Sequence, residues 1–160
     1  MMKGVCLRYA ANEAEAEDIL QEAFLLAFRK LETYDHKGAL GGWLRRLTVN
    51  KALEQYRKNA TIGRMKDRYK TMIEKSVDDR VFEQLNLEDL LLKIQQLPTG
   101  YRTVFNLYAI EGFNHREIAE KLKISAGTSK SQYSRARSIL GAMIQEEQEE
   151  ELKRLAYAKR

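Results

Sequence analysis

Hydroxyl, amide and basic side chains are concentrated in one short stretch near the C-terminal end of this sequence of 160 residues. No acidic residue occurs between Ser125 and Gln145. The candidate residues are Thr128, Lys130, Ser131, Gln132, Ser134 and Arg135. Side chains of these kinds hydrogen-bond to base edges and to phosphate oxygens, and the Arg135 fork could reach guanine O6 and N7 together. The stretch therefore predicts a surface for an anionic partner.

Two helices are expected to position these side chains. Asn114 followed by Glu117 is a capping pair that opens a short helix. Lys123 lies in the turn, and Ser125 can cap the longer helix that follows. The inward face of that longer helix is expected to contain Ser129, Tyr133, Ala136 and Leu140. This order of a short helix, a tight turn and a long helix with a polar face is typical of a helix-turn-helix. A plain helical hairpin is the alternative.

The charge is distributed unevenly along the chain. Its net value is +5, but residues 37–70 and 99–140 are positive, whereas 1–36, 71–98 and 141–160 are negative. Two basic blocks fit a nucleic acid that is contacted at two places. Two solvated helical faces are the alternative interpretation of the same pattern.

The composition limits the classes of protein to which this chain can belong. One proline and 44% hydrophobic residues favour a mainly helical chain with one or two modest cores. A single cysteine, Cys6, excludes an internal disulfide framework and suits a reducing cytoplasm. The two histidines, His36 and His115, show no metal-ligand spacing, and no apolar run approaches the roughly 18 residues of a membrane span. We expect a cytoplasmic protein without cofactor, metal or membrane span.

Helical periodicity occurs in two blocks. We expect an all-α fold of two small helical domains, 1–58 and 85–142, joined by a flexible linker at 59–84, where periodicity is weak. Residues 143–160 are expected to form a charged helical tail.

Individual helices can be placed within each block. In the first, Asn12 caps a helix over about 13–32, and a second helix covers about 40–58. The apolar positions of the first helix are Ala16, Ile19, Leu20, Ala23, Phe24, Ala27 and Leu31. In the second block, one helix, with Asn86 as a candidate cap, stops at Pro98. The next one ends near Gly112, and its inward residues are expected to be Tyr101, Val104, Phe105 and Tyr108.

Two stretches resemble a known family. The sequence "EAEDILQEAFLLAFRKL" followed by "GGWLRRLTVNKALEQYRK" resembles region 2 of the extracytoplasmic-function (ECF) sigma factors of the sigma-70 family. The sequence "LPTGYRTVFNLYAIEGFNHREIAEKLKISAGTSKSQYSRAR" is similar to their region 4. These factors are promoter-specificity subunits of bacterial RNA polymerase. Compared with the family, the start "MMKGVCLRYA" makes region 2 shorter, and Lys123 replaces the usual glycine of the turn.

The resemblance implies partners and site residues. It implies binding of core RNA polymerase, through the clamp helices of the largest subunit and the flap of the second largest, and of promoter DNA. An anti-sigma factor is a further candidate partner. The implied polymerase-binding residues are Asp18, Gln21, Glu22 and Leu25. The implied contacts to the −10 element are Tyr34, His36, Lys37, Trp43, Arg46, Asn50 and Arg57. The implied contacts to the −35 element are the six residues from Thr128 to Arg135 that are named above. For Trp43, packing in the core is an alternative role.

Parts of the sequence are also compatible with other functions. Asp18 and Glu22, four residues apart, could hold a divalent ion for nuclease chemistry, but no third carboxylate follows at a suitable spacing. We therefore expect no enzyme. A helix-turn-helix regulator that binds operators without docking on core polymerase is the main alternative, with 13–58 as a dimerisation or sensing domain. A polymerase-binding protein without promoter activity is another.

Overall fold

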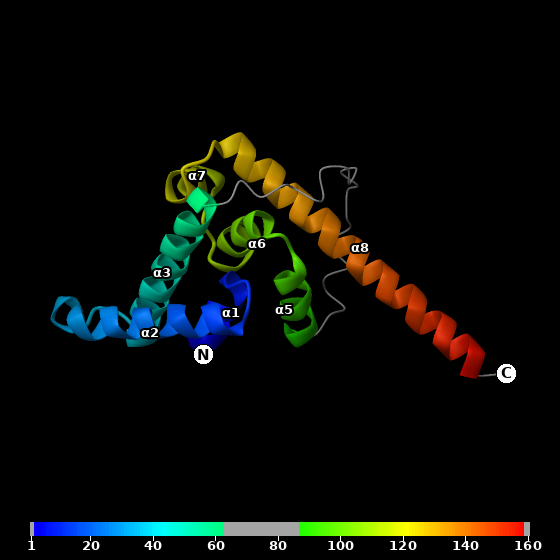
Figure 1. Ribbon diagram of the computed structural model, residues 1–160, viewed down its shortest axis with the longest axis horizontal. Coiled ribbons are helices and arrows are strands. Elements are labelled where there is room, and N and C mark those ends of the chain that lie inside the picture. Colours follow the sequence, from blue (N-terminus) through cyan, green and yellow to red (C-terminus); the bar gives the residue numbers. More distant parts are fainter. Residues whose placement is uncertain (1, 63–86, 159–160) are drawn as a thin grey trace.

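The computed structural model describes residues 2–62 and 87–158, and every regular element in these ranges is a helix (Figure 1). The first range contains α1 (Met2–Tyr9), α2 (Glu13–Arg29), the 3-10 turn η1 (Leu31–Thr33) and α3 (Leu40–Ile62). The second contains α5 (Leu87–Gln96), α6 (Thr99–Phe105), the π-helical turn η2 (Asn106–Ile110), α7 (His115–Leu122) and α8 (Ala126–Ala158). The predicted all-α fold in two parts is confirmed.

Helix α2 begins where the capping pair predicts. The Asn12 side chain accepts the Glu15 N–H at 2.9 Å, and the Glu15 carboxylate accepts the Ala11 N–H at 2.5 Å. The helix ends at Arg29 rather than near residue 32, because the chain tightens into η1, where the Thr33 hydroxyl donates to the Lys30 carbonyl. Capping predicted the start of this helix, while its end is set by the turn that follows.

Helix α3 starts at Leu40, as predicted, but extends beyond residue 58 to Ile62. The first residues of the predicted linker are therefore helical. The rest of that linker, and Asn86 as a cap, lie outside the described residues.

The buried face of α2 is narrower than predicted. Ala16, Ile19, Ala23 and Ala27 are buried. Phe24 and Leu31, expected among the inward residues, are 40% and 52% exposed. Phe24 follows Ala23 and points about 100° away from it, and Leu31 lies beyond the end of the helix. The small alanine side chains and Ile19 are buried against the neighbouring helices, whereas Phe24, Leu25 and Phe28 remain at the surface.

The helices of the second described range follow the prediction with one exception. Helix α5 ends at Gln96, ahead of Pro98, and Gly112 has the left-handed φ of +76° that suits a residue after a helix end. Tyr101, Val104 and Phe105 are buried. Tyr108 is 39% exposed instead, because it lies in the wider turn of η2, where its ring stacks on His115 at 4.4 Å.

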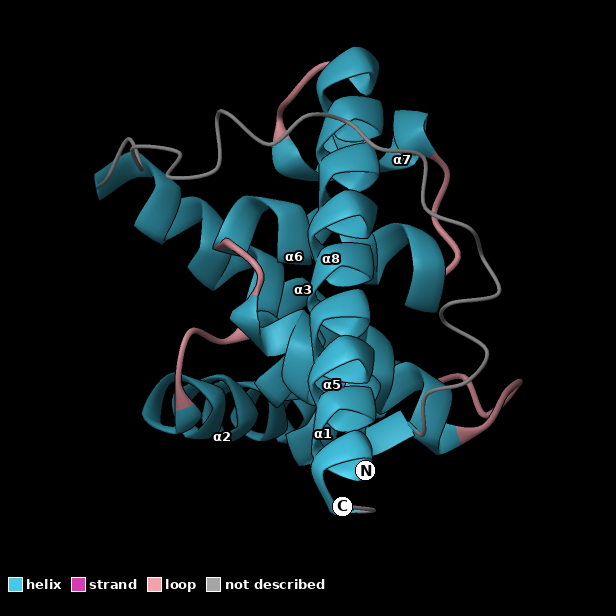
Figure 2. Ribbon diagram, turned by 90° about the vertical axis from the view of Figure 1, so that its right-hand side faces the viewer, coloured by secondary structure: helices cyan, strands magenta, loops and turns pink. Residues whose placement is uncertain are grey.

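The two parts of the chain share a hydrophobic core. One cluster lies within the second part, around Ile94, Tyr101 and Leu140. The other cluster combines residues of both parts, namely Val5, Cys6, Tyr9, Ala10, Ala16, Ile19, Val49, Ala52, Leu53, Val104, Leu107, Ile118 and Leu122. Helix α1 contacts α5 and α6, and α3 contacts α7. Helix α8 runs without interruption past α6 (Figure 2). The two parts are therefore packed on one another, and we call this contact the junction.

Hydrogen bonds complete the junction at the C-terminal end of α1. The carbonyl groups of its last three residues each accept a hydrogen bond from a side chain of the second part. The pairs are Gln95 Nε2 to Leu7 at 3.2 Å, Asn106 Nδ2 to Arg8 at 2.8 Å and Arg102 Nη2 to Tyr9 at 3.2 Å. Such carbonyls have no partner within their own helix, so these contacts act as a C-cap supplied from a distance.

Two leucines of α8 allow a test of the core. Leu140 is completely buried, whereas Leu152 is 67% exposed. Leu140→Ala should lower the free energy of unfolding by about 2–5 kcal/mol, because it leaves a cavity. Leu152→Ala should change it by less than about 0.5 kcal/mol. Urea denaturation followed by circular dichroism measures both values, and similar losses in the two variants would contradict the assigned burial.

Candidate nucleic-acid interface

The helix-turn-helix has the predicted local geometry. The Asn114 side chain accepts the Arg116 and Glu117 N–H groups at 2.9 and 3.1 Å, and the Glu117 carboxylate accepts the Asn114 N–H at 2.8 Å. Lys123 adopts the left-handed conformation, with φ 56° and ψ 46°. Ser125 Oγ then accepts the Thr128 N–H at 2.9 Å. Each predicted capping interaction of α7 and α8 is therefore confirmed.

Ser129 and His115 form a polar pair within the helix-turn-helix. Ser129 is completely buried, and its Oγ lies 2.9 Å from His115 Nδ1. The imidazole ring also stacks on Tyr108 and meets Tyr133 edge-on at 5.9 Å. Burial, followed by the charge of Lys130, lowers the pKa of His115, which favours a neutral ring. His115 was not predicted to have a role, and only its position three residues before the buried Ile118 could have indicated an inward side chain.

The −35 candidates do not all lie on one surface. Lys130 and Ser134 are exposed, and Thr128, Ser131 and Arg135 are half-buried. Gln132 points towards the junction instead. Its amide nitrogen and the Tyr56 hydroxyl both lie 3.7 Å from the position that a Cβ at Gly100 would take. Its Oε1 is buried and finds no hydrogen-bond partner among the described residues.

Three of the −10 candidates form an aromatic cluster between the loop before α3 and the first turn of that helix. The Tyr34 ring lies 4.6 Å from His36 and 5.5 Å from Trp43, measured between ring centroids. His36 has a left-handed φ of 58°, and the Tyr34 hydroxyl donates to the Gly38 carbonyl. Trp43 is half-buried, so its ring is partly accessible. The loop is therefore folded into a defined aromatic surface.

The remaining −10 candidates differ in their surroundings. Lys37, Arg46 and Asn50 are exposed. The Lys37 N–H donates to the Asp35 carboxylate at 3.2 Å. Arg57 lies about two helical turns beyond Asn50, and its guanidinium donates to the Lys121 carbonyl of α7 at 3.2 Å. Arg57 thus takes part in the junction.

The polymerase-binding candidates share the outer face of α2. Asp18, Gln21, Glu22 and Leu25 are all exposed. Glu22 forms an ion pair with Lys51 of α3 at 3.0 Å. Exposed apolar side chains continue this face towards η1, and they are Phe24, Leu25, Phe28 and Leu31. Clusters of exposed apolar side chains are found at interaction surfaces, and Phe28, the most exposed of these four, was not among the residues predicted from the sequence.

A buried acidic residue was also missed. Glu111, 8% exposed at its side chain, accepts two hydrogen bonds from Arg45, Nε to Oε2 at 2.9 Å and Nη2 to Oε1 at 3.0 Å. Arg8 Nη2 lies 3.4 Å from Oε1. The hydrogen bond to Glu111 raises the pKa of Arg45. This carboxylate therefore joins two basic residues of the first part to the second.

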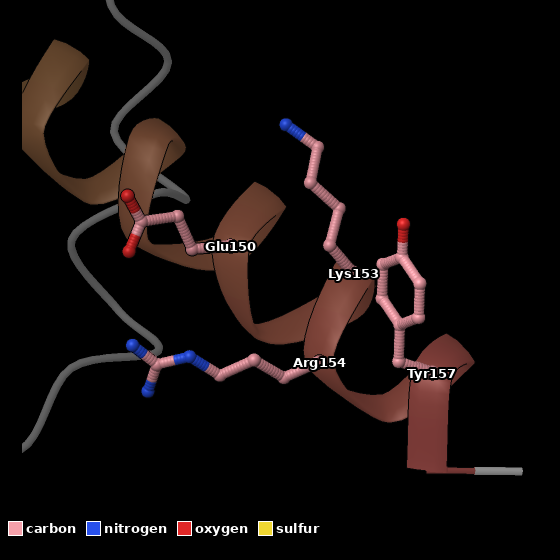
Figure 3. Close-up of a pocket in the computed structure, with 4 residues that line it drawn as sticks. All are labelled: Glu150, Lys153, Arg154 and Tyr157. Atoms are coloured by element: carbon pink, nitrogen blue, oxygen red, sulfur yellow. The ribbon is translucent and has the colours of Figure 1, made fainter.

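A surface hollow lies near the C-terminal end of α8. The hollow formed by Glu150, Lys153, Arg154 and Tyr157 involves a single helix, since all four side chains come from the end of α8 (Figure 3). Within 2–62 and 87–158, no three His, Cys, Asp or Glu residues are grouped so that they could hold a metal ion. No helix in the same ranges is long and apolar enough to cross a membrane.

Comparison with known proteins agrees with this geometry. Residues 1–62 match the family model for Sigma-70 region 2, and residues 87–140 match that for Sigma-70, region 4. The ECF RNA polymerase sigma factor SigW of Bacillus subtilis is 32% identical over 155 residues, covering 89% of this chain and 82% of SigW. SigE of Mycolicibacterium smegmatis, also an ECF RNA polymerase sigma factor, is 32% identical over 138 residues. That match covers 83% of this chain but only 53% of SigE.

A solved structure shows the same fold. The sigma factor RpoE of Bartonella quintana, in complex with the anti-sigma factor NepR, matches with a TM-score of 0.53 and 24% identity. The match covers 90% of this chain and 89% of RpoE. Sequence and fold together place the chain in the sigma-70 family, and it belongs to the ECF sigma factors within it. The match of residues 1–62 to region 2 does not favour an operator-binding regulator, in which this part would serve dimerisation or sensing.

The left-handed turn residue provides a test of the helix-turn-helix. Lys123→Gly should raise the free energy of unfolding by about 0.5–1 kcal/mol, because glycine adopts this conformation without steric cost. Lys130→Gly is the matched control, since it places the same change in an exposed helical position and should cost about 1 kcal/mol. Urea denaturation compares the two, and equal destabilisation would show that residue 123 is not left-handed in solution.

Proposed function

We propose that this sigma factor binds core RNA polymerase and directs it to promoters by contacting the −10 and −35 elements. The observation that carries the proposal is the presence of both promoter-binding regions, in order, on one helical chain. In this role the protein works in the cytoplasm and catalyses no reaction itself. An anti-sigma factor is a candidate partner, because RpoE of Bartonella quintana was crystallised with one.

Docking on the polymerase is assigned to the outer face of α2. Asp18, Gln21 and Glu22 provide polar and acidic groups beside the exposed apolar side chains of Leu25 and its neighbours. An apolar centre that loses its water on contact provides affinity, and surrounding charges orient the encounter. We assign this face to the clamp helices of the largest subunit, and the second part of the chain to the flap of the second largest.

Recognition of the −10 element is assigned to the aromatic cluster and the start of α3. Extruding a base from the duplex costs a few kcal/mol, which stacking and hydrogen bonds to the base edge can offset. Tyr34, His36 and Trp43 offer ring faces for stacking. Arg46 and Asn50 are exposed on the same helix as Trp43, where they can reach a phosphate or a base edge.

Recognition of the −35 element is assigned to the first turns of α8 in the major groove. Lys130, Ser134 and Arg135 are the main candidates, with Thr128 and Ser131 alongside. The hydroxyls of the last two are held locally, since Ser125 and Thr128 share a hydrogen bond of 2.8 Å and Ser131 Oγ donates to the Thr128 carbonyl. Gln132 would contribute only after leaving its place beside Gly100.

Charge reversal tests the docking face. Asp18→Lys should weaken binding to core polymerase by roughly 1–3 kcal/mol, because it places a cation where a carboxylate is expected to meet the partner. Glu149→Lys makes the same charge change on the tail and should leave affinity unchanged. Affinity is measured by titrating purified core enzyme with labelled protein. Equal affinity of Asp18→Lys and the unsubstituted protein would refute this assignment.

Promoter specificity tests the groove-facing side of α8. Arg135→Ala should remove roughly 1–3 kcal/mol of discrimination between a cognate promoter and one with a scrambled −35 element, because a base contact carries sequence information. If Arg135 contacts a phosphate instead, its loss should lower transcription from both promoters alike and reduce the salt dependence of binding. Arg154→Ala, on the tail, is the control. Transcription in vitro with core polymerase gives the ratio of transcript from the cognate promoter to transcript from the scrambled one. If this ratio is unchanged in Arg135→Ala at several salt concentrations, base readout by Arg135 is contradicted.

A further inference from the structure

The Ser129 hydroxyl is a polar group inside the helix-turn-helix. Ser129 is completely buried, and its sequence neighbours Thr128 and Lys130 are both candidates for contacts to the −35 element. A buried hydroxyl costs free energy unless it is hydrogen-bonded. His115 Nδ1 lies 2.9 Å from the Ser129 Oγ and meets this need. A hydrogen bond therefore joins the start of α7 to the first turns of α8.

Aromatic rings hold His115 in place. The ring of Tyr108 in η2 lies 4.4 Å from the imidazole ring, measured between centroids, at an interplanar angle of 14°. Tyr133 of α8 meets the imidazole at 60° from 5.9 Å, and Tyr133 is itself stacked on Phe105 at 5.8 Å. Contacts with two rings fix the plane of the imidazole and so the direction in which Nδ1 points. His115 thereby connects η2, α7 and α8 through one side chain.

The position of Ser129 determines how the start of α8 is turned about its own axis. Successive residues of a helix point about 100° apart, so a rotation that moves Ser129 moves Lys130 and Ser131 by the same angle. A binding group is effective only when it is held within about 0.5 Å of its working position. We propose that His115 is a positioning residue for −35 recognition, because its neutral ring holds Ser129 and so orients the first turns of α8. The inference rests on the proposed function of these turns.

The charge state of His115 decides whether it can serve this purpose. The groups that face its ring come from η2 and α8, and they are Tyr108, Ser129, Lys130 and Tyr133. Helix α3 meets α7 at its opposite end, at the Lys121 carbonyl. A protonated ring would bring a second positive charge near Lys130, at the N-terminal end of α7, where the helix dipole also disfavours cations. Nδ1 would then be a donor, so the Ser129 hydroxyl could no longer donate to it. Protonation therefore weakens the contact that orients α8.

The pH dependence of this contact has a definite sign. Burial, followed by the charge of Lys130, lowers the pKa of His115 in the folded protein below its ordinary value of 6.5. The unfolded chain therefore binds this proton more readily than the folded chain. The contribution to stability is fully present above a pH of about 6.5 and decreases as the pH falls below it.

Nuclear magnetic resonance of the full chain tests the contact without polymerase or DNA. The side-chain nitrogen signals of His115 should show a neutral ring at neutral pH and a titration midpoint below 6.5. The amide signals of residues 128–131 should shift with the same midpoint, because the ring orients this turn. His36→Gln removes the second histidine of the chain and makes the assignment unambiguous. Amide signals of α8 that do not follow the titration of His115 would overturn the proposal.

Promoter discrimination tests the role in recognition. The ratio of transcript from a cognate promoter to transcript from one with a scrambled −35 element should fall about fivefold in His115→Ala, the lower end of what one base contact supplies. Ser129→Ala should lose as much, and the double variant no more, because both substitutions remove the same contact. Ser138→Ala is the matched control, since it removes another serine hydroxyl of α8, one that donates to the Ser134 carbonyl. Additive losses in the double variant would give the two residues separate roles and overturn the proposal.

The pH profile separates positioning from a merely structural role. The ratio should fall when the pH is lowered from about 7.5 to about 5.5, values on either side of the ordinary histidine pKa. His115→Gln should retain most of the ratio, because its amide can hydrogen-bond to Ser129, and should make the ratio independent of pH. If His115 binds a phosphate as a cation instead, acid should tighten binding to both promoters alike and leave their ratio unchanged. That result would overturn the proposal.

Failure of the proposed function gives a different result. If the unsubstituted protein with core polymerase transcribes from neither promoter, the sigma-factor role is refuted, while the resonance titration still reports on the contact of His115 with Ser129. If transcription from the cognate promoter occurs but the ratio is the same in His115→Ala, Ser129→Ala and the unsubstituted protein, the positioning role alone is refuted.

Discussion

The three carbonyl groups at the C-terminal end of α1 impose the constraint on which the arrangement of the chain depends. They have no partner in their own helix, and the second part of the chain covers them. A buried carbonyl must be paired, so Gln95, Arg102 and Asn106 have to face α1. This fixes α5, α6 and η2 against the first part. Val104 and Leu107, on the same segment, are then directed into the core that both parts share.

The wide turn of η2 positions side chains for several contacts at once. Asn106 starts it and points to α1, while Glu111 follows its end and reaches Arg45. Tyr108, between them, faces the other way and stacks on His115. A regular α-helix would place these side chains at other angles, and π-helical turns are often found at functional positions. One local irregularity thus connects the core, the ion pair and the helix-turn-helix.

Much of the secondary structure could be predicted because its signals are local. Asn12 with Glu15, and Asn114 with Glu117, mark helix starts through contacts only three residues apart. Lys123 lies in the turn at the position where the family usually has glycine, and its backbone is left-handed. The family resemblance, in turn, depended on two long stretches whose spacing is characteristic.

The remaining features depend on contacts that a linear pattern does not encode. Glu111 and Arg45 are separated by 66 positions, and neither stands out in a count of charges. Periodicity identified the alanine face of α2 but could not show that Phe24 lies outside it, because adjacent apolar residues fit either of two faces. Gln132 was assigned from its chemistry to DNA, whereas the packing of α3 near Gly100 decides where its side chain points.

The uninterrupted length of α8 has a mechanical consequence. The helix has 33 residues, which corresponds to about 50 Å at 1.5 Å per residue. Its last buried residue is Ile144, and Lys93 of α5 pairs with Glu147 just beyond it. One uninterrupted helix therefore includes both the turns that we assign to the −35 element and the exposed tail. A rotation of about 10° around its first turn would move the far end by roughly 9 Å, so the tail acts as a lever arm that amplifies small reorientations of the helix-turn-helix.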